Sequence, residues 1–193
     1  MKKIILASSS RWRLGILKKA GIAFTVEESG YEEDMTRKLS PEKLVKKFAL
    51  GKALAVAKRH PRAIVIGADT VLLQGGRVLG KPKNKREAVA MLRKWSGTSG
   101  RAVTAFAIVN ARSGKRVVRV AQTRIFFRKL SAREIAAYVA TGEPMSGAGA
   151  FTIMEGGASF VRRIEGDFYN IAGLPLALLL QELKKFGILE QGR

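Results

Sequence analysis

Asp69 is a carboxylate inside an otherwise apolar, largely β-branched run, residues 64–73, of the kind that forms a buried strand. A pair of glycines at 75–76 follows, and then a second run, residues 78–82, that contains Lys81. Two glycines between such runs indicate a two-residue hairpin turn, whose register would place Lys81 opposite Thr70 and beside Asp69. Burying a carboxylate is costly unless it is paired or used. The hairpin therefore predicts either a satisfied ion pair or the centre of a site.

Ser8 and Ser10 lie between a short apolar run and a helix predicted over residues 11–20. A serine at a helix start caps free backbone N–H groups, and the positive end of the helix dipole attracts anions. Arg13, in the first turn, would add a guanidinium that suits phosphate. The pattern favours a phosphate site, while the alternative stays open that Ser10 is only an N-cap and Arg13 only a surface residue.

Glu33 belongs to an acidic stretch, residues 27–34, that reverses the sign of an otherwise basic chain. Carboxylates bind hard cations, usually one or two of them together with phosphate oxygens of a substrate. The alternative is a solvated acidic loop that pairs with neighbouring lysines.

Lys52 lies on a long helix that Ser40 and Pro41 are expected to open. Its spacing from Val45 and Phe48 places it in the middle of that helix's apolar face. A lysine on such a face either extends to the surface or contacts a buried anion.

The elements that must position these residues follow from periodicity, caps and turns. Ser131 and Glu134 form a capping box. Strands are predicted over residues 3–7, 22–27, 64–73, 78–82, 102–111 and 116–128, and helices over 11–20, from 41 onward, 84–95, 131–140 and 176–186. The length of 193 residues fits one well-buried domain.

Charge is the abnormal feature of the composition, with 36 Lys and Arg against 15 Asp and Glu, a net charge of +21. Such a field attracts polyanions. Aromatic residues make up only 7% of the chain and are not interleaved with its basic pairs, so nucleic-acid binding is open but not favoured. The absence of cysteine excludes disulfides and thiolate metal sites, and no apolar run is long enough to span a membrane. A cytoplasmic location is expected.

Several motifs, in one collinear order, resemble those of the Maf family of nucleotide pyrophosphatases. The resemblance covers nearly the whole chain, and the matching segments are residues 6–13 (L-A-S-S-S-R-W-R), Glu33, Lys52, 67–70 (G-A-D-T), 80–82 (G-K-P), 96–97 (S-G), 143–144 (E-P), 148–150 (A-G-A) and 166–175 (G-D-F-Y-N-I-A-G-L-P). Each segment alone is weak, but their shared order is specific.

This resemblance implies an α/β fold, a two-lobed single domain over residues 1–193 around a long mixed β-sheet with flanking helices, of inosine-triphosphatase-like architecture. It further implies that the cleft between the lobes takes a nucleoside triphosphate, with Mg²⁺ or Mn²⁺ as cofactor. Hydrolysis between the α- and β-phosphates would give a monophosphate and pyrophosphate and so sanitise the nucleotide pool. A homodimer is compatible with this expectation, and no membrane partner is expected.

The same resemblance implies roles for individual residues. Glu33 and Asp69 would bind the metal or orient and deprotonate the attacking water, and Lys52 and Lys81 would neutralise charge on the phosphate oxygens. The implied substrate-binding residues are Ser8, Ser10, Trp12, Arg13 and Thr70.

Some positions depart from the family pattern, at Arg11, Gly100, Ser146-Gly147 and Met154-Glu155. Trp12 is typical of members associated with 7-methyl-GTP, whereas the Ala68-Asp69-Thr70 segment is typical of those associated with dTTP and UTP, so the base stays open. Two other functions stay open as well, a basic nucleotide- or nucleic-acid-binding protein without turnover and an inosine-triphosphate-type pyrophosphatase.

Overall fold

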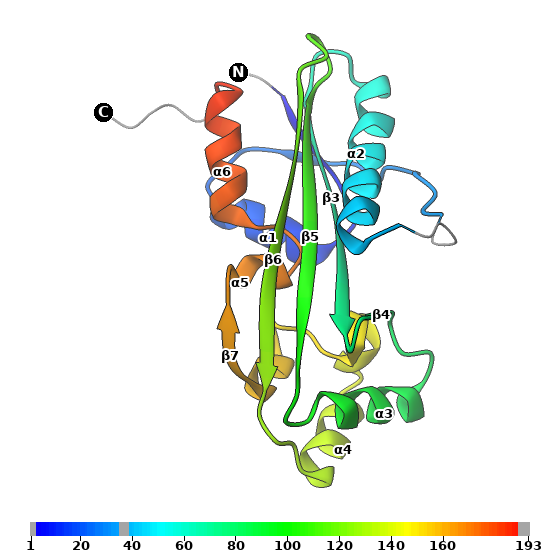
Figure 1. Cartoon of the computed structure of the whole chain (residues 1–193). Coiled ribbons are helices and arrows are strands. Elements are labelled where there is room, and N and C mark those ends of the chain that lie inside the picture. Colours follow the sequence, from blue (N-terminus) through cyan, green and yellow to red (C-terminus); the bar gives the residue numbers. More distant parts are fainter. Residues whose placement is uncertain (1–2, 35–38, 189–193) are drawn as a thin grey trace. The chain divides into compact units, whose positions relative to one another are not determined.

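The computed structural model describes residues 3–34 and 39–188, in which strands and helices form an α/β fold around a mixed sheet (Figure 1). The described strands form one seven-stranded sheet in the order β2-β1-β3-β5-β6-β7, with β4 paired to β3. The strands are β1 (Ile4–Ala7), β2 (Thr25–Val26), β3 (Ile64–Gln74), β4 (Arg77–Leu79), β5 (Ser99–Asn110), β6 (Arg116–Phe127) and β7 (Val161–Glu165).

The helices are α1 (Arg11–Lys19), α2 (Pro41–Arg59), α3 (Lys85–Trp95), α4 (Ala132–Ala140), α5 (Phe168–Ile171) and α6 (Leu176–Lys185), with 3₁₀ turns η1 (Glu143–Ser146), η2 (Ala148–Ala150) and η3 (Gly156–Phe160). These elements divide into two compact units. Of the described residues, the first unit holds those up to Thr70, Thr104–Ala121 and those from Gly173 on, and the second holds Val71–Val103 and Gln122–Ala172. The boundary falls inside β3, β5 and β6.

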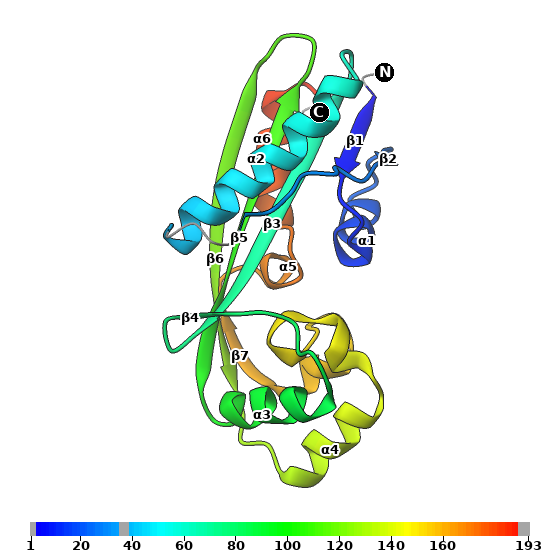
Figure 2. The same cartoon turned by 90° about the vertical axis from the view of Figure 1, so that its right-hand side faces the viewer.

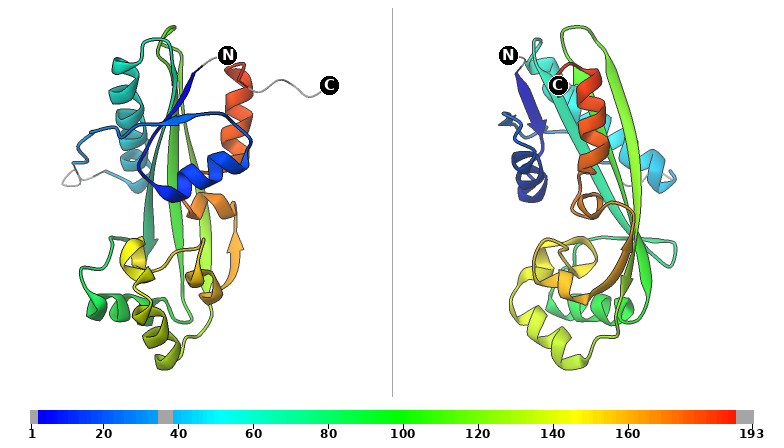
Figure 3. Two further views of the ribbon diagram at one scale, coloured as in Figure 1. Left: turned by 180° about the vertical axis from the view of Figure 1, so that it is seen from behind. Right: turned by 90° about the vertical axis from the view of Figure 1, so that its left-hand side faces the viewer.

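In the first unit, β1 pairs in parallel with both β2 and β3. Helices α2 and α6 lie on opposite faces of the strands (Figures 2 and 3). Strand β3 is buried on both sides along this stretch, which explains why its residues are apolar on both faces apart from Asp69 and Thr70. The predicted strand over residues 22–27 is reduced to the two residues of β2.

In the second unit, α3 and α4 lie on one face of the strands (Figure 2). Their core is centred on Trp95, whose ring stacks on Phe127 at 4.5 Å between centroids and whose Nε1 donates to Gly149 O at 2.9 Å. Strand β7 was not predicted from the sequence, because its exposed Arg162 and Arg163 hide the alternation.

The hairpin at residues 64–82 confirms the two-residue turn, because Gln74 pairs with Arg77. The ladder then ends at the pair Leu72–Leu79, so the prediction that strand pairing places Lys81 opposite Thr70 is wrong. Directly after β4, the carbonyl of Gly80 accepts a hydrogen bond from Gly149 N at 2.9 Å instead of pairing with β3.

Within the described residues, no helix combines the length and the apolar character needed to cross a membrane.

Candidate active site

Helix α2 and strand β3 approach closely in the first unit and bring Lys52 to Asp69. Ser40 caps the helix by accepting from Lys43 N, and Val45 and Phe48 bury its apolar face. A Cβ at Gly67 would lie 2.3 Å from the Ala49 carbonyl oxygen, so a side chain there would force the helix off the strand. The glycine of the G-A-D-T segment thus sets the distance between helix and strand.

The ammonium of Lys52 joins two carboxylates. Its Nζ lies 2.8 Å from Asp69 Oδ1 and 2.5 Å from Glu33 Oε1, and it donates to Ala68 O at 3.5 Å. These three contacts use the three donors of the group. The side chains of Lys52 and Asp69 are only 12% and 9% exposed, against 39% for Glu33. Of the two alternatives for a lysine on an apolar helix face, extension to the surface or contact with a buried anion, Lys52 therefore follows the second.

Burial raises the pKa of Asp69 above its ordinary value, although Lys52 and Arg13 act in the opposite direction. The negative charge of Glu33 adds to the rise. Burial likewise lowers the pKa of Arg13, which Asp69 and Glu33 oppose. The neighbouring cations thus do not fully offset the cost of burying the negative charge of Asp69. Such a raised pKa is common among carboxylates that exchange protons in active sites.

The guanidinium of Arg13 is held by three oxygen atoms from distant parts of the first unit. It donates to Gly173 O at 2.9 Å, to Ser8 Oγ at 3.3 Å and to Thr70 Oγ1 at 3.2 Å. Thr70 Oγ1 in turn lies 3.0 Å from Thr104 Oγ1. The alternative of a plain surface arginine is therefore wrong, because this fork is fixed from three sides.

Ser10 is the N-cap of α1, since its Oγ accepts from Arg13 N at 3.5 Å. Its backbone N–H donates to Ser8 Oγ at 3.2 Å. Trp12 is half-buried, and the guanidinium of Arg11 lies 4.1 Å from the centre of its ring. The roles of Ser10 and Trp12 toward a substrate stay predictions.

Lys81 is exposed and belongs to the second unit, beyond the end of β4. Its participation in the site stays a prediction, as does the cleft between lobes.

The two carboxylates fit a hard divalent cation. Glu33 and Asp69 present oxygen donors that meet at one ammonium, so an added cation would find anionic oxygen on both sides. Among the residues that the structure describes, no group of three or more ligating His, Cys, Asp or Glu side chains occurs. Such a pair suits Mg²⁺, which usually takes one or two carboxylates and completes its shell with water and substrate phosphates.

Sequence reasoning missed two contributors, Thr104 and Gly173. Thr104 is a fully buried hydroxyl in the apolar strand β5, and this is the signal that could have identified it. Gly173 contributes only its carbonyl oxygen, with φ at 103°, a conformation that glycine tolerates.

Two of the departures from the family pattern are built into the packing of the second unit. A Cβ at Gly100 would lie 2.4 Å from Leu73 O, and one at Gly147 would lie 2.2 Å from Phe151 O. Larger residues there would require the backbone to move.

Comparison with known proteins agrees with the resemblance. The model of the family described as Maf-like protein matches residues 3–186. The chain is 46% identical over 187 residues to the dTTP/UTP pyrophosphatase of Pelotomaculum thermopropionicum, covering 97% of this chain and 98% of that relative. It is 43% identical over 193 residues to the dTTP/UTP pyrophosphatase of Moorella thermoacetica, covering 100% of both chains.

A nucleoside triphosphate pyrophosphatase from Synechococcus sp. is 45% identical over 186 residues, covering 95% of this chain and 94% of that relative. Among solved structures, the Ham1 protein of Staphylococcus aureus aligns with a TM-score of 0.46 and 16% identity over 65% of this chain and 72% of that one, which is too weak to carry an inference. The family model and the full-length relatives, together with the ordered motifs, show that the chain belongs to the Maf family.

Proposed function

We propose that the chain is a divalent-metal-dependent pyrophosphatase that hydrolyses dTTP and UTP to the monophosphate and pyrophosphate. The observation that carries the proposal is the cluster in which Lys52 joins Glu33 to Asp69 while Arg13 is fixed in the same unit. The names of the relatives support the triphosphate chemistry and the choice of pyrimidine nucleotides.

Hydrolysis of a phosphoanhydride depends on positioning and on electrostatic stabilisation more than on covalent chemistry. Arg13, held by Ser8 and Thr70, presents a preorganised guanidinium to the phosphate oxygens. Lys52 neutralises the charge that develops on those oxygens as the α–β bridge breaks.

Asp69 is suited to accept the proton of the attacking water, because its raised pKa makes it a stronger base than an ordinary aspartate. The water oxygen adds to phosphorus, its proton passes to Asp69, and the bridging oxygen leaves with the pyrophosphate. Glu33, together with oxygens of the substrate phosphates, would hold the metal ion while Asp69 acts as the base, and the ion would supply further neutralisation of the phosphate charge when bound.

A nucleotide panel with Mg²⁺ or Mn²⁺ tests the proposal, with dTTP, UTP, 7-methyl-GTP and ITP as substrates. We expect pyrophosphate and monophosphate in equal amounts, fastest from dTTP and UTP, and no release after treatment with a chelator. Release of orthophosphate alone would contradict the reaction, and a preference for ITP or 7-methyl-GTP would contradict the assigned base.

Glu33 and its neighbour Glu32 offer a matched pair for the same assay. We expect Glu33→Gln to lower pyrophosphate release by about 10²-fold, because a charged oxygen at Lys52 is lost. Glu32→Gln, an exposed change of the same chemistry one residue away, should leave release unchanged. Equal effects of the two substitutions would contradict the role of Glu33.

A further inference from the structure

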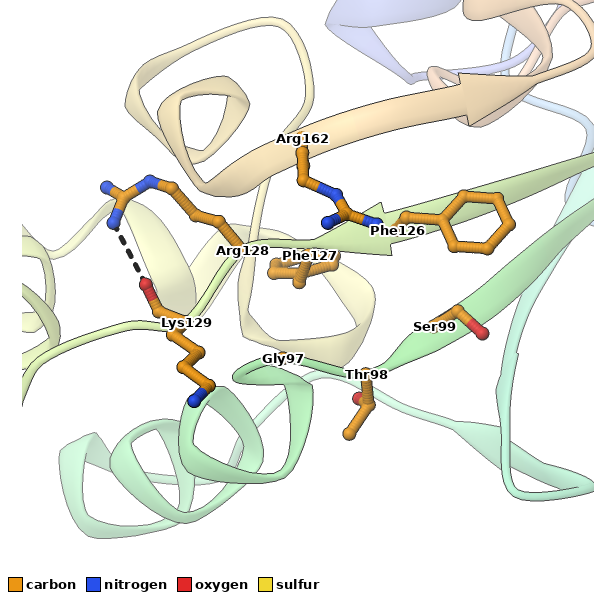
Figure 4. A pocket seen from close by; sticks show the side chains of 8 residues that line it. All are labelled: Gly97, Thr98, Ser99, Phe126, Phe127, Arg128, Lys129 and Arg162. Carbon is orange, nitrogen blue, oxygen red and sulfur yellow. Dashed lines mark hydrogen bonds between the residues drawn. The ribbon is translucent and has the colours of Figure 1, made fainter.

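The second unit carries a cavity of about 470 Å³ at the ends of β5, β6 and β7 (Figure 4). Three of its lining residues are cations, Arg128, Lys129 and Arg162. The aromatic residue Phe126 also lines it. In Figure 4, Arg162 extends from β7 toward the strand that carries Phe126. The cavity is thus basic and has an aromatic wall.

The face of β6 beside this cavity continues the same chemistry. Along β6, Ile125 and Phe127 are buried in the core, and alternation directs Arg124 and Phe126 to the opposite face. Arg128 directly follows the strand, and an extended chain spans the four residues from Arg124 to Arg128 in about 13 Å. The basic surface is therefore longer than one phosphate group.

Strand pairing adds cations from β7 to this face. Arg163 pairs with Phe126 in the ladder, and its guanidinium lies 4.3 Å from the centre of the Phe126 ring, with that of Arg124 at 5.2 Å. The register shifts between Phe126 and Phe127, so that β7 contains one extra residue, Arg162. Arg124 and Phe126 are near neighbours in the sequence, whereas Arg163 reaches the same ring only because β6 and β7 pair in the sheet.

Positive charge on this surface exceeds what its own ion pairs neutralise. We define the basic patch as Arg124, Arg128, Lys129, Arg162 and Arg163. Arg124 and Arg163 share one carboxylate, Glu165, at 3.9 and 2.9 Å, and Arg128 pairs with Glu134 at 2.7 Å.

Within the part of the chain that the structure describes, the side chains of Lys129 and Arg162 have no ion-pair partner. Both line the cavity. The two unpaired cations suit the phosphates of a nucleic-acid backbone. The Arg163 guanidinium over the Phe126 ring offers planar groups on which a base can stack.

We propose that the basic patch binds single-stranded nucleic acid, with phosphates at Lys129 and Arg162 and a base stacked at the Phe126–Arg163 pair. The length of the patch favours a polyanion over a free nucleotide, and the net charge of +21 favours the same ligand. The proposal concerns a surface of the second unit and does not rest on the pyrophosphatase activity of the first.

Fluorescence anisotropy with a labelled single-stranded oligonucleotide of about 16 nucleotides tests the proposal over a series of salt concentrations. We expect binding by the wild-type chain that weakens as salt rises. The double variant Lys129→Gln/Arg162→Gln should bind about tenfold more weakly, and its log–log salt slope should be smaller by about 1.4, the value for two lost single-strand phosphate contacts.

The matched control is Arg112→Gln/Arg116→Gln, which removes the same charge from exposed positions near the turn between β5 and β6. We expect it to bind as the wild type does. Equal losses in the two double variants would overturn the proposal, because binding would then follow net charge alone. Thermal denaturation followed by circular dichroism checks that each variant is folded before its binding is compared.

Phe126→Leu separates stacking from charge, because it removes the ring and keeps every cation. We expect about tenfold weaker binding with an unchanged salt slope. If free UTP displaced the oligonucleotide completely at a similar phosphate concentration, the proposal would be overturned in favour of a mononucleotide site. Binding that is unaltered in both Phe126→Leu and the Lys129→Gln/Arg162→Gln variant would also overturn the proposal.

Discussion

Asp69 in the first unit and Glu143 in the second are two carboxylates with opposite environments. Asp69 has a 2.8 Å contact with one cation, Lys52, and burial raises its pKa. Burial also acts to raise the pKa of Glu143, but hydrogen bonds outweigh it and the pKa is lowered.

The hydrogen bonds to Glu143 come from four donors. Oε1 accepts from Tyr138 Oη and Thr152 Oγ1, both at 2.6 Å, and from Gly157 N at 3.0 Å, while Oε2 accepts from Gly156 N at 3.1 Å. Both acids lie in motifs that resemble those of the family, yet only Asp69 is left with a charge that its surroundings do not fully stabilise. The comparison teaches that burial with few hydrogen-bond donors raises the pKa of one carboxylate, whereas four donors lower the pKa of the other.

Loss of the cation at Asp69 should have the largest effect. Lys52→Met keeps the apolar face of α2 and removes the charge between the two carboxylates, so we expect kcat/KM for pyrophosphate release to fall by about 10²–10³-fold. Lys52→Arg should restore part of the loss, since it returns the charge. Wild-type activity in Lys52→Met would show that the cluster is only structural.

Glu143→Gln should instead lower stability. The amide NH2 replaces one carboxylate oxygen and so faces at least one of the four donors, Gly156 N, without an acceptor, and we expect the free energy of unfolding to fall by about 2 kcal/mol, measured by denaturant titration. Activity per folded molecule should be retained. Glu32→Gln is the control, and an equal loss of stability in both variants would remove the distinction.

The pH dependence of stability should have opposite signs at the two sites. A raised pKa means that the folded state holds the Asp69 proton longer, so ionising Asp69 lowers stability as pH rises above 3.8. A lowered pKa means that the contribution of Glu143 is complete above pH 4.5 and is lost as pH falls below it.

Unfolding free energies of wild type, Asp69→Asn and Glu143→Gln, compared from acidic to neutral pH, should therefore diverge. As pH rises, the wild type should become more stable relative to Glu143→Gln and less stable relative to Asp69→Asn, as measured by the free energy of unfolding. Parallel curves would contradict the different environments.

A matched pair of threonines should give the smallest effects. Thr70→Val removes an acceptor of Arg13 and a partner of Thr104 Oγ1, so we expect KM to rise about fivefold and the free energy of unfolding to fall by about 1 kcal/mol. Thr152→Val removes a donor to Glu143 and should lower unfolding free energy by about 1 kcal/mol with KM unchanged. Steady-state kinetics separate the two variants, denaturant titration measures their stability, and a rise in KM for both would contradict the separation.

Local rules were sufficient to predict the caps, the hairpin turn and one helix face. The caps at Ser10 and Ser40, the two-glycine turn and the apolar face of α2 follow from residues near one another in the chain, and all were confirmed. The capping box at Ser131 was confirmed for the same reason. Lys52 could be recognised because a charge interrupts an apolar helical face.

Long-range hydrogen bonds account for what could not be predicted. The β4 ladder keeps the predicted register but ends at Leu79, where Gly80 O accepts instead from Gly149 N, so the pairing does not extend to Lys81. The Gly173 carbonyl that holds Arg13 is separated from it by 160 positions and has no side-chain signal. The donors around Glu143 likewise come from α4 and from a loop, so their convergence appears only in the fold.

The central claim is that Asp69, and not Glu143, acts in pyrophosphate release. It is tested most directly by kcat/KM for UTP with Asp69→Asn and Glu143→Gln, both measured where denaturation curves show them folded. We predict that the Asp69→Asn value is lower than the Glu143→Gln value by about 10²-fold or more, the range of a lost general base. Equal values for the two variants would contradict the account.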